Sequence, residues 1–305
     1  YCLTPQSQVA GPRRPDEPRN PAKPLLAQMS LLAARHAGDD AILVEAVDPL
    51  ARYLAHWEAT QLSRLGLFTW RSHRGSGSDN HPAVYGRPFD SSADVFLNCL
   101  MVEEYRAMAT IAGRLGREVA PWLRRAEALA GRIASLMWDE RDGAFYNLDV
   151  GAADAGRVTQ AVTWTVPLKF RTWTLCMPLW AGIASPDQAA RVAAHLMDRR
   201  GLRSPHGLRS LAADEPAYRI VASTNPSDWQ GPIWVVANHL AVAGLRRHGF
   251  TAEAAALADD LVAMLEADLA ATGEMHEYYH PETGQGLTHP GFLNWNSLAV
   301  GLRQA

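Results

Sequence analysis

The sequence predicts an all-α fold of the α/α-toroid type, in which buried and half-exposed helices alternate along the chain. Half-exposed helices are indicated where apolar residues recur with helical spacing, over residues 118–137, 187–199 and 252–269. Buried helices are indicated where the residues are apolar almost all round, over residues 93–112, 168–183 and 232–246. A toroid alternates inner and outer helices in this way and carries its functional loops at one end.

The remaining segments complete this pattern. Residues 1–24 are rich in Pro and Arg and are expected to form an irregular lead-in. Residues 25–36 and 41–62 are expected to form a helix pair split at Gly38, and residues 138–146 have the composition of a hairpin. About nine helices are predicted, fewer than the twelve that close a barrel of six helical hairpins. We therefore expect one domain over residues 1–305 whose earliest helices are missing at the N-terminus.

Composition excludes several classes of protein. The chain has 305 residues, of which 48% are hydrophobic and 20% are charged, as in globular proteins. A net charge of −3 argues against nucleic-acid binding, and no apolar run reaches the roughly 18 residues that cross a membrane. The three Cys are too scattered for a disulfide framework, so a cytoplasmic location is expected. The oligomeric state stays open, a homo-oligomer included.

Aromatic content points to the kind of ligand. The chain has ten Trp against seven Phe, although Trp is a demanding core residue because its N–H needs a partner. Flat aromatic walls are typical of carbohydrate clefts. A sugar is therefore one ligand that this composition favours. Ordinary packing explains part of the high Trp content.

Structural roles are predicted for several polar residues outside the loops. Glu103 and Glu104 lie in a predicted helix and are expected at a solvated edge. Asp90 precedes two serines and is expected in an N-cap region. Cys99 falls in a buried helix and is expected to be an inert small hydrophobe.

The first unusual loop spans residues 70–82 and contains Trp70, Gly77, Asp79 and Asn80. It is not a phosphate-binding loop, because the third glycine of such a motif would fall at Asn80 and no Gly-Lys-Ser follows. A capped turn, in which Asp79 accepts backbone N–H groups, is the structural alternative to a catalytic role.

The second loop, residues 225–234, contains two tryptophans. Gly231 and Pro232 are expected to open the helix over 232–246, with Pro232 at its first position. Trp229 and Trp234 would then flank the N-terminus of that helix. Core packing and a sugar-stacking wall are both open for this pair.

The third loop, residues 273–284, contains the motif His276-Glu277-x-x-His280. On a helix this motif binds zinc, with the Glu as base. Pro281 follows the second His directly and disfavours helical geometry there, and no third ligand is evident. No metal is therefore expected, and Tyr278 after the carboxylate suits a cleft wall better.

Taken together, these loops resemble glycoside hydrolase family 63. The matching segments are Ser76-Gly77-Ser78-Asp79-Asn80-His81-Pro82, Trp229-Gln230-Gly231-Pro232-Ile233-Trp234, Glu277-Tyr278-Tyr279-His280-Pro281-Glu282-Thr283-Gly284, and the closing Gly291-Phe292-Leu293-Asn294-Trp295. Within the family, the chain looks most like the bacterial glucosylglycerate and mannosylglycerate hydrolases. The resemblance runs from about residue 20 to the end of the chain and implies an (α/α)6 toroid catalytic domain.

The resemblance implies an inverting hydrolase of α-glycosidic bonds, with Asp79 as general acid and Glu277 as general base. Inversion needs one carboxylic acid to protonate the leaving oxygen and a second carboxylate to activate water on the opposite face of the sugar. Asp79 would hold a proton near neutral pH, Glu277 would stay ionised, and no cofactor would be required. The small-molecule substrate would be contacted by Trp70, Gly77, Asn80, Trp229, Gln230, Trp234, Tyr278 and Trp295.

Some features depart from the family pattern. Asp228 stands where these hydrolases often have Tyr, Gln230 replaces a frequent Arg, and the early W-x-W-D-type segment is absent. Glucosylglycerate or mannosylglycerate is the favoured substrate, and a neutral α-glucoside or oligosaccharide is the alternative. Other classes also stay open: a sugar-binding scaffold without turnover, a zinc hydrolase, and an epimerase that uses His73, His81, His276 and His280.

Overall fold

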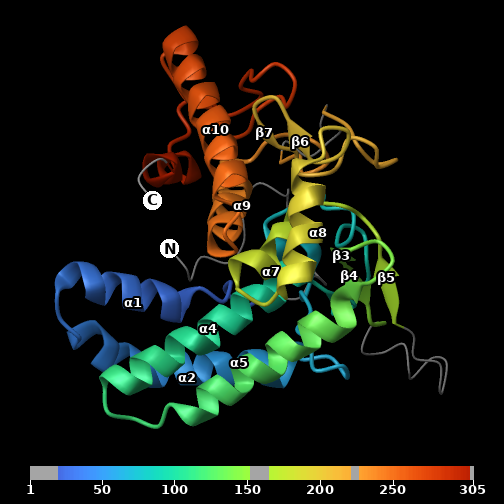
Figure 1. Ribbon diagram of the computed structural model, residues 1–305. Coiled ribbons are helices and arrows are strands. Elements are labelled where there is room, and N and C mark those ends of the chain that lie inside the picture. The colour runs from blue at the N-terminus through green and yellow to red at the C-terminus, as the bar shows by residue number, and fades with distance from the viewer. Residues whose placement is uncertain (1–19, 152–164, 221–226, 303–305) are drawn as a thin grey trace, which may run out of the picture. The chain divides into compact units, whose positions relative to one another are not determined.

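The structure is a computed structural model that describes residues 20–151, 165–220 and 227–302 (Figure 1). The chain folds into two compact units. Unit 1 comprises residues 1–77, 86–137 and 147–168, and unit 2 comprises residues 78–85, 138–146 and 169–305. Because the chain passes between the units several times, each unit is built from segments distant in sequence.

Unit 1 is mainly helical. Its principal helices are α1 (Leu26–Ala37), α2 (Ala41–Gln61), α4 (Val95–Arg114) and α5 (Ala120–Arg132). Helix α4 packs against α1, α2 and α5, and it is buried along most of its length (Figure 1). These four helices confirm the predicted ones, although the last turn of the helix predicted over 118–137 is a π-helix, η2 (Ile133–Met137).

A small antiparallel sheet adjoins these helices in unit 1. Its strands are β1 (Ser92–Ala93), β4 (Asn147–Asp149) and β5 (Val166–Leu168), in the order β1-β4-β5. Asp94 follows β1 and caps helix α4, accepting hydrogen bonds from the N–H groups of Phe96 and Leu97 at 2.7 and 3.3 Å. The predicted cap region at Asp90 is therefore wrong, because Asp90 pairs instead with Arg71 at 3.1 Å.

Solvent exposure was expected for both Glu103 and Glu104, and it is correct only for Glu103, which is partly exposed. Glu104 is buried in unit 1, where its carboxylate accepts hydrogen bonds from the N–H groups of Ala27 and Gln28 at 2.6 and 3.3 Å. It thus satisfies N–H groups of the first turn of α1, which has no side-chain cap of its own. Burial raises the pKa of Glu104, and these hydrogen bonds oppose that rise.

We expect Glu104→Ala to lower the free energy of unfolding by about 2–4 kcal/mol, because it leaves N–H groups of α1 without an acceptor. Glu103→Ala is the matched control, since Glu103 forms a part-exposed ion pair with Arg106, and its loss should cost at most about 1 kcal/mol. Urea denaturation of both variants measures the difference. Equal losses would contradict the capping role of Glu104.

Unit 2 contains three long helices and several short elements. The long helices are α8 (Pro186–Met197), α9 (Val235–Arg247) and α10 (Thr251–Thr272), and α9 packs against α10 (Figure 1). The short elements are β2 (Trp138–Asp139), β3 (Ala144–Phe145), η3 (Trp173–Cys176), α7 (Met177–Trp180), β6 (Arg203–Ser204), β7 (Gly207–Leu208) and η4 (Trp295–Gly301).

Two predicted helices of unit 2 are corrected. The helix expected over 168–183 is only the short η3 and α7, because Thr172 is extended and forms a β-bridge with Leu211. The helix expected over 232–246 begins at Val235, because Ile233 forms β-bridges with Arg209 and Tyr279. Pro232 therefore lies before the helix and not at its first position.

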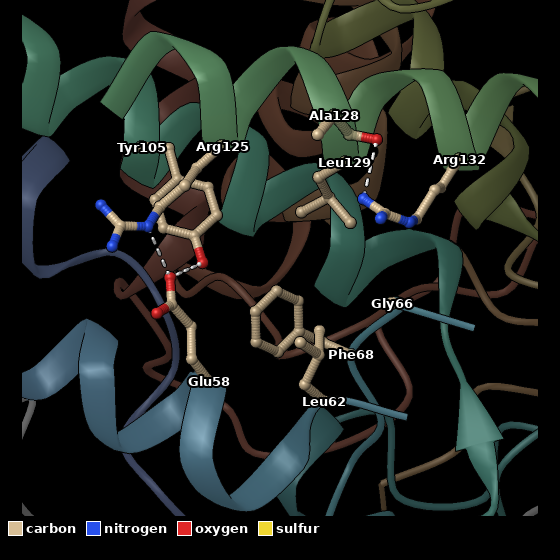
Figure 2. A pocket seen from close by; sticks show the side chains of 9 residues that line it. All are labelled: Glu58, Leu62, Gly66, Phe68, Tyr105, Arg125, Ala128, Leu129 and Arg132. Atoms are coloured by element: carbon tan, nitrogen blue, oxygen red, sulfur yellow. Dashed lines mark hydrogen bonds and ion pairs between the residues drawn. The ribbon is translucent and has the colours of Figure 1, made fainter. Parts of the chain in front are cut away.

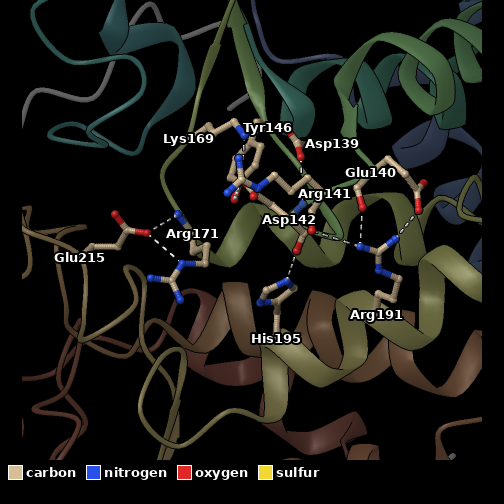
Figure 3. A network of polar contacts seen from close by, with 10 residues as sticks. All are labelled: Asp139, Glu140, Arg141, Asp142, Tyr146, Lys169, Arg171, Arg191, His195 and Glu215. Carbon is tan, nitrogen blue, oxygen red and sulfur yellow. Dashed lines mark hydrogen bonds and ion pairs between the residues drawn. The ribbon is translucent and has the colours of Figure 1, made fainter.

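The predicted hairpin over 138–146 is confirmed as β2 and β3. Its turn closes through a hydrogen bond from the Gly143 N–H to the Asp139 carbonyl at 2.8 Å. Helix α8 holds the turn in place, since Arg191 pairs with Glu140 at 2.6 Å and a His195 ring nitrogen lies 2.8 Å from the Asp142 carbonyl oxygen (Figure 3). This network holds the turn between β2 and β3, which contains none of the predicted site residues.

The longest helices, α2, α4 and α10, carry charged residues along their length. Within the described ranges, no helix combines the length and the apolar character that crossing a bilayer requires.

Candidate active site

Asn80 connects the first and second motifs within unit 2. Its side-chain amide donates to Asp228 Oδ1 at 2.9 Å and accepts from the Trp229 N–H at 2.6 Å. The Gln230 side chain donates in return to the Asn80 carbonyl at 2.8 Å. These three bonds connect residues 78–85 to residues 227–234, which contain Trp229 and Trp234 and are called the tryptophan loop below. The side-chain amides of Asn80 and Gln230 thus hold this loop in place. Their contact with a sugar stays a prediction.

We expect Asn80→Ala to lower the free energy of unfolding by about 2–4 kcal/mol. The substitution leaves the buried Trp229 N–H without its acceptor and Asp228 Oδ1 without one of its two donors. Urea denaturation measures the loss, and Asn294→Ala, at an exposed position, should stay within about 0.5 kcal/mol of the wild type. A loss at Asn80 as small as the one at Asn294 would show that the connection contributes little.

The second and third motifs are joined by backbone pairing. Ile233 and Tyr279 exchange two hydrogen bonds, of 2.9 Å from the Ile233 N–H and 3.0 Å from the Tyr279 N–H. This antiparallel bridge places Tyr278 and Glu277 beside the tryptophan loop. The extended backbone at Ile233, just before α9 begins at Val235, thus also pairs the second motif with the third.

Four predicted aromatic residues lie together in unit 2. The rings of Trp229 and Trp234 stack in parallel, with centroids 4.0 Å apart and planes inclined by 8°. Tyr278 and Trp295 lie against Trp234 at 4.7 and 5.5 Å. Trp229 and Trp234 are 4% and 1% exposed, whereas Trp295 is half-buried and forms the more accessible end of the cluster. Only that end offers substantial ring surface to solvent.

The two predicted catalytic carboxylates are both buried in unit 2. Asp79 is 2% exposed and Glu277 is 6% exposed. Burial raises the pKa of Glu277, the negative charge of Asp79 raises it further, and a hydrogen bond and the charge of His289 act in the opposite direction. The net effect is a pKa of Glu277 above its ordinary value.

The His276-Glu277-x-x-His280 segment is not helical, in agreement with the expected effect of Pro281. Its three side chains bind different partners. A ring nitrogen of His276 lies 2.9 Å from Asp268, Glu277 contacts His289, and Nδ1 of His280 accepts from the N–H of Glu282 at 3.1 Å. Nowhere in the described ranges do three His, Cys, Asp or Glu side chains gather in a way that could hold a metal ion.

Comparison with known proteins adds the family. Residues 4–295 match the sequence model of the mannosylglycerate hydrolase MGH1-like glycoside hydrolase domain. The chain belongs to this family. Among curated relatives, the mannosylglycerate hydrolase of Thermus thermophilus is 28% identical over 208 residues, which are 67% of this chain and 43% of the relative. That of Rubrobacter radiotolerans is 26% identical over 198 residues, or 63% and 39% of the two chains. The chain thus spans about two fifths of the length of these relatives.

Solved structures establish the fold of this MGH1-like domain. A GH63 mannosylglycerate hydrolase from Thermus thermophilus in complex with glucose superposes with a TM-score of 0.71 at 23% identity, covering 92% of this chain and 74% of that one. The neutral trehalase of Saccharomyces cerevisiae gives a TM-score of 0.67 at 17% identity, covering 92% and 62%. The predicted all-α fold of the (α/α)6 toroid type is confirmed.

Two predicted substrate contacts lie in unit 1 of the MGH1-like domain. Trp70 is buried there, with ring centroids 6.1 Å from Trp57 and 6.4 Å from Phe96. Gly77 ends the short helix α3 (His73–Ser76) with φ of 69°, a left-handed conformation that favours glycine. Contact of either residue with substrate stays a prediction.

Two residues that the motifs do not mark as site residues contact predicted ones. Asp228 is fully buried, its Oδ1 accepts from Asn80 and from the Gln230 N–H, and burial raises its pKa. His289 lies 2.5 Å from Glu277. The only sequence signal for Asp228 is its departure from the family's Tyr, and nothing in the sequence marks His289.

A separate cavity lies in unit 1 and has a volume of about 190 Å³ (Figure 2). Its wall is part apolar and part charged, and Glu58 accepts there from the Tyr105 hydroxyl at 2.7 Å and pairs with Arg125 at 3.1 Å. None of the predicted site residues lines this cavity, so the candidate active site is assigned from the motifs and their contacts.

Proposed function

We propose that the protein hydrolyses an α-glycosidic bond with inversion, with Asp79 as general acid and Glu277 as general base. The observation that carries the proposal is the placement of two buried carboxylates from the first and third motifs in one unit, where the charge of Asp79 acts on Glu277. Membership of a glycoside hydrolase family gives this pair its chemistry.

In the proposed reaction, Asp79 gives its proton to the glycosidic oxygen as the bond from that oxygen to the anomeric carbon breaks. Glu277 accepts a proton from a water molecule whose oxygen bonds to the anomeric carbon from the opposite face. The products are the free sugar, in the opposite anomeric configuration, and the released alcohol. Asp79 then regains a proton and Glu277 loses one.

The favoured substrate is mannosylglycerate or glucosylglycerate. The support is that both curated relatives described above are mannosylglycerate hydrolases. A neutral α-glucoside is the second candidate, because Gln230 and Asp228 stand where the family often has Arg and Tyr. A neutral amide and a carboxylate offer no positive charge to a glycerate carboxylate, whereas they can bind hydroxyl groups.

The direct test is release of free sugar from mannosylglycerate, glucosylglycerate and trehalose, with and without a chelator. We expect release from one of them that the chelator does not change. Proton NMR of the first product molecules should show the β-anomer, because inversion converts an α-linkage into a β-sugar. Binding of these compounds without release would favour the sugar-binding scaffold, and chelator-sensitive release would favour a metal hydrolase.

A further inference from the structure

His289 makes a direct contact with the proposed base. Its Nδ1 lies 2.5 Å from Glu277 Oε2, and the Thr288 hydroxyl lies 3.5 Å from the same nitrogen. The side chain of His289 is 49% exposed, whereas that of Glu277 is 8% exposed. When Glu277 is ionised its oxygens only accept, so Nδ1 must carry the hydrogen of this bond.

The backbone at His289 is unusual. Its φ is +49°, in the left-handed region that is uncommon for residues other than Gly, although Asn, Asp and His adopt it more often than the rest. Just before it, the Glu277 N–H donates to the Thr288 carbonyl at 3.0 Å, which fixes the two segments beside each other. A histidine held in this conformation against a buried carboxylate is the pattern of strain that accumulates at functional sites.

Within the described ranges, two charged side chains act on Glu277. Asp79 raises its pKa together with burial, and His289 lowers it both as hydrogen-bond donor and as a charge. His289 therefore opposes burial and the charge of Asp79, the two effects that favour the protonated form of Glu277.

We propose that His289 is the positioning residue of the base, holding Oε2 of Glu277 in a hydrogen bond and leaving Oε1 to accept the proton of the attacking water. This inference rests on the proposed function of Glu277. It also predicts that the hydrogen bond from His289 helps to keep Glu277 ionised.

Two variants separate this role from a purely structural one. His289→Gly suits the left-handed backbone best, yet it removes both the hydrogen bond and the charge. His289→Asn also tolerates this backbone and keeps a neutral N–H donor. If His289 only shaped the turn, neither variant would change the titration of Glu277. His206→Asn is the control, because it removes a histidine of unit 2 that makes no contact with Glu277.

The measurement is the Glu277 pKa from carboxyl 13C NMR, with the resonance assigned by its loss in Glu277→Gln. We expect His289→Gly to raise this pKa by about one unit, and His289→Asn by less. The acidic limb of kcat/KM should move to higher pH by the same amounts, with no shift in His206→Asn. An unchanged Glu277 pKa in His289→Gly would overturn the inference. The NMR titration needs no turnover, so a wild-type protein that releases no sugar would contradict the proposed function separately.

Discussion

Glu277→Gln is expected to lower kcat by about 10²–10⁴ while sugar binding stays within a few fold of the wild type. Gln has nearly the same shape as Glu and can still accept the hydrogen bond from His289 through its amide oxygen. It cannot accept a proton from water at neutral pH. The loss therefore falls on the chemical step, which single-turnover kinetics and calorimetric titration with the substrate measure separately.

Glu274→Gln is the matched control for this prediction. Glu274 lies three residues upstream on the same segment, is exposed, and has no contact with Asp79 or His289. It should retain wild-type turnover and stability. A Glu277→Gln protein that turns over substrate at near wild-type rate would rule out Glu277 as the base, both in the proposed inverting reaction and in the zinc alternative.

Asp79→Asn is expected to lose about 10²–10⁴ in kcat on a natural glycoside, whose alkoxide is a poor leaving group without protonation. The same variant should lose much less on the matching α-glycosyl fluoride, because fluoride leaves without an acid. Glu277→Gln should lose activity on both substrates, since each reaction needs an activated water. The ratio of the two losses thus assigns acid and base without a crystal of the complex.

The outcome that contradicts the assignment is an equal loss of Asp79→Asn on both substrates. Such a result would mean that Asp79 holds the site together, as in the capped-turn alternative, and does not transfer a proton. Asp214→Asn, an exposed carboxylate of unit 2 paired with Arg171 at 2.9 Å, serves as the control for removing one negative charge.

Sequence periodicity predicted the helices whose partners are other helices, such as α1, α2 and α5. It was wrong where distant backbone pairing competes with helix formation. Thr172 and Ile233 both sit in apolar runs that suit a helix, yet each forms a β-bridge with a residue far along the chain. The burial of Glu104 could not be predicted for the same reason. Its buried carboxylate accepts from N–H groups of a helix more than seventy residues away in the sequence.

The candidate site shows the same division between local and long-range information. By residue type and order, the motifs predict Asp79, Glu277 and the tryptophans as site residues. The motifs do not mark His289. Its contact with Glu277 joins residues twelve positions apart and depends on the left-handed backbone at His289. The motifs also predict substrate contact for Asn80 and Gln230. They carry no sign that the amides of these residues are hydrogen bonded to each other's loops.

Residues 78–85 carry Asp79 into unit 2, although the sequence on both sides belongs to unit 1. This excursion is bounded by Gly77 and Gly86, whose φ angles of 69° and 72° allow sharp turns at both ends. During synthesis, Asp79 leaves the ribosome about 200 residues before Glu277 and must wait for most of unit 2. Contacts of such long sequence separation form slowly. We therefore expect Asp79 and Glu277 to come together in unit 2 late in folding. A fragment that begins after residue 85 would carry Glu277 without Asp79.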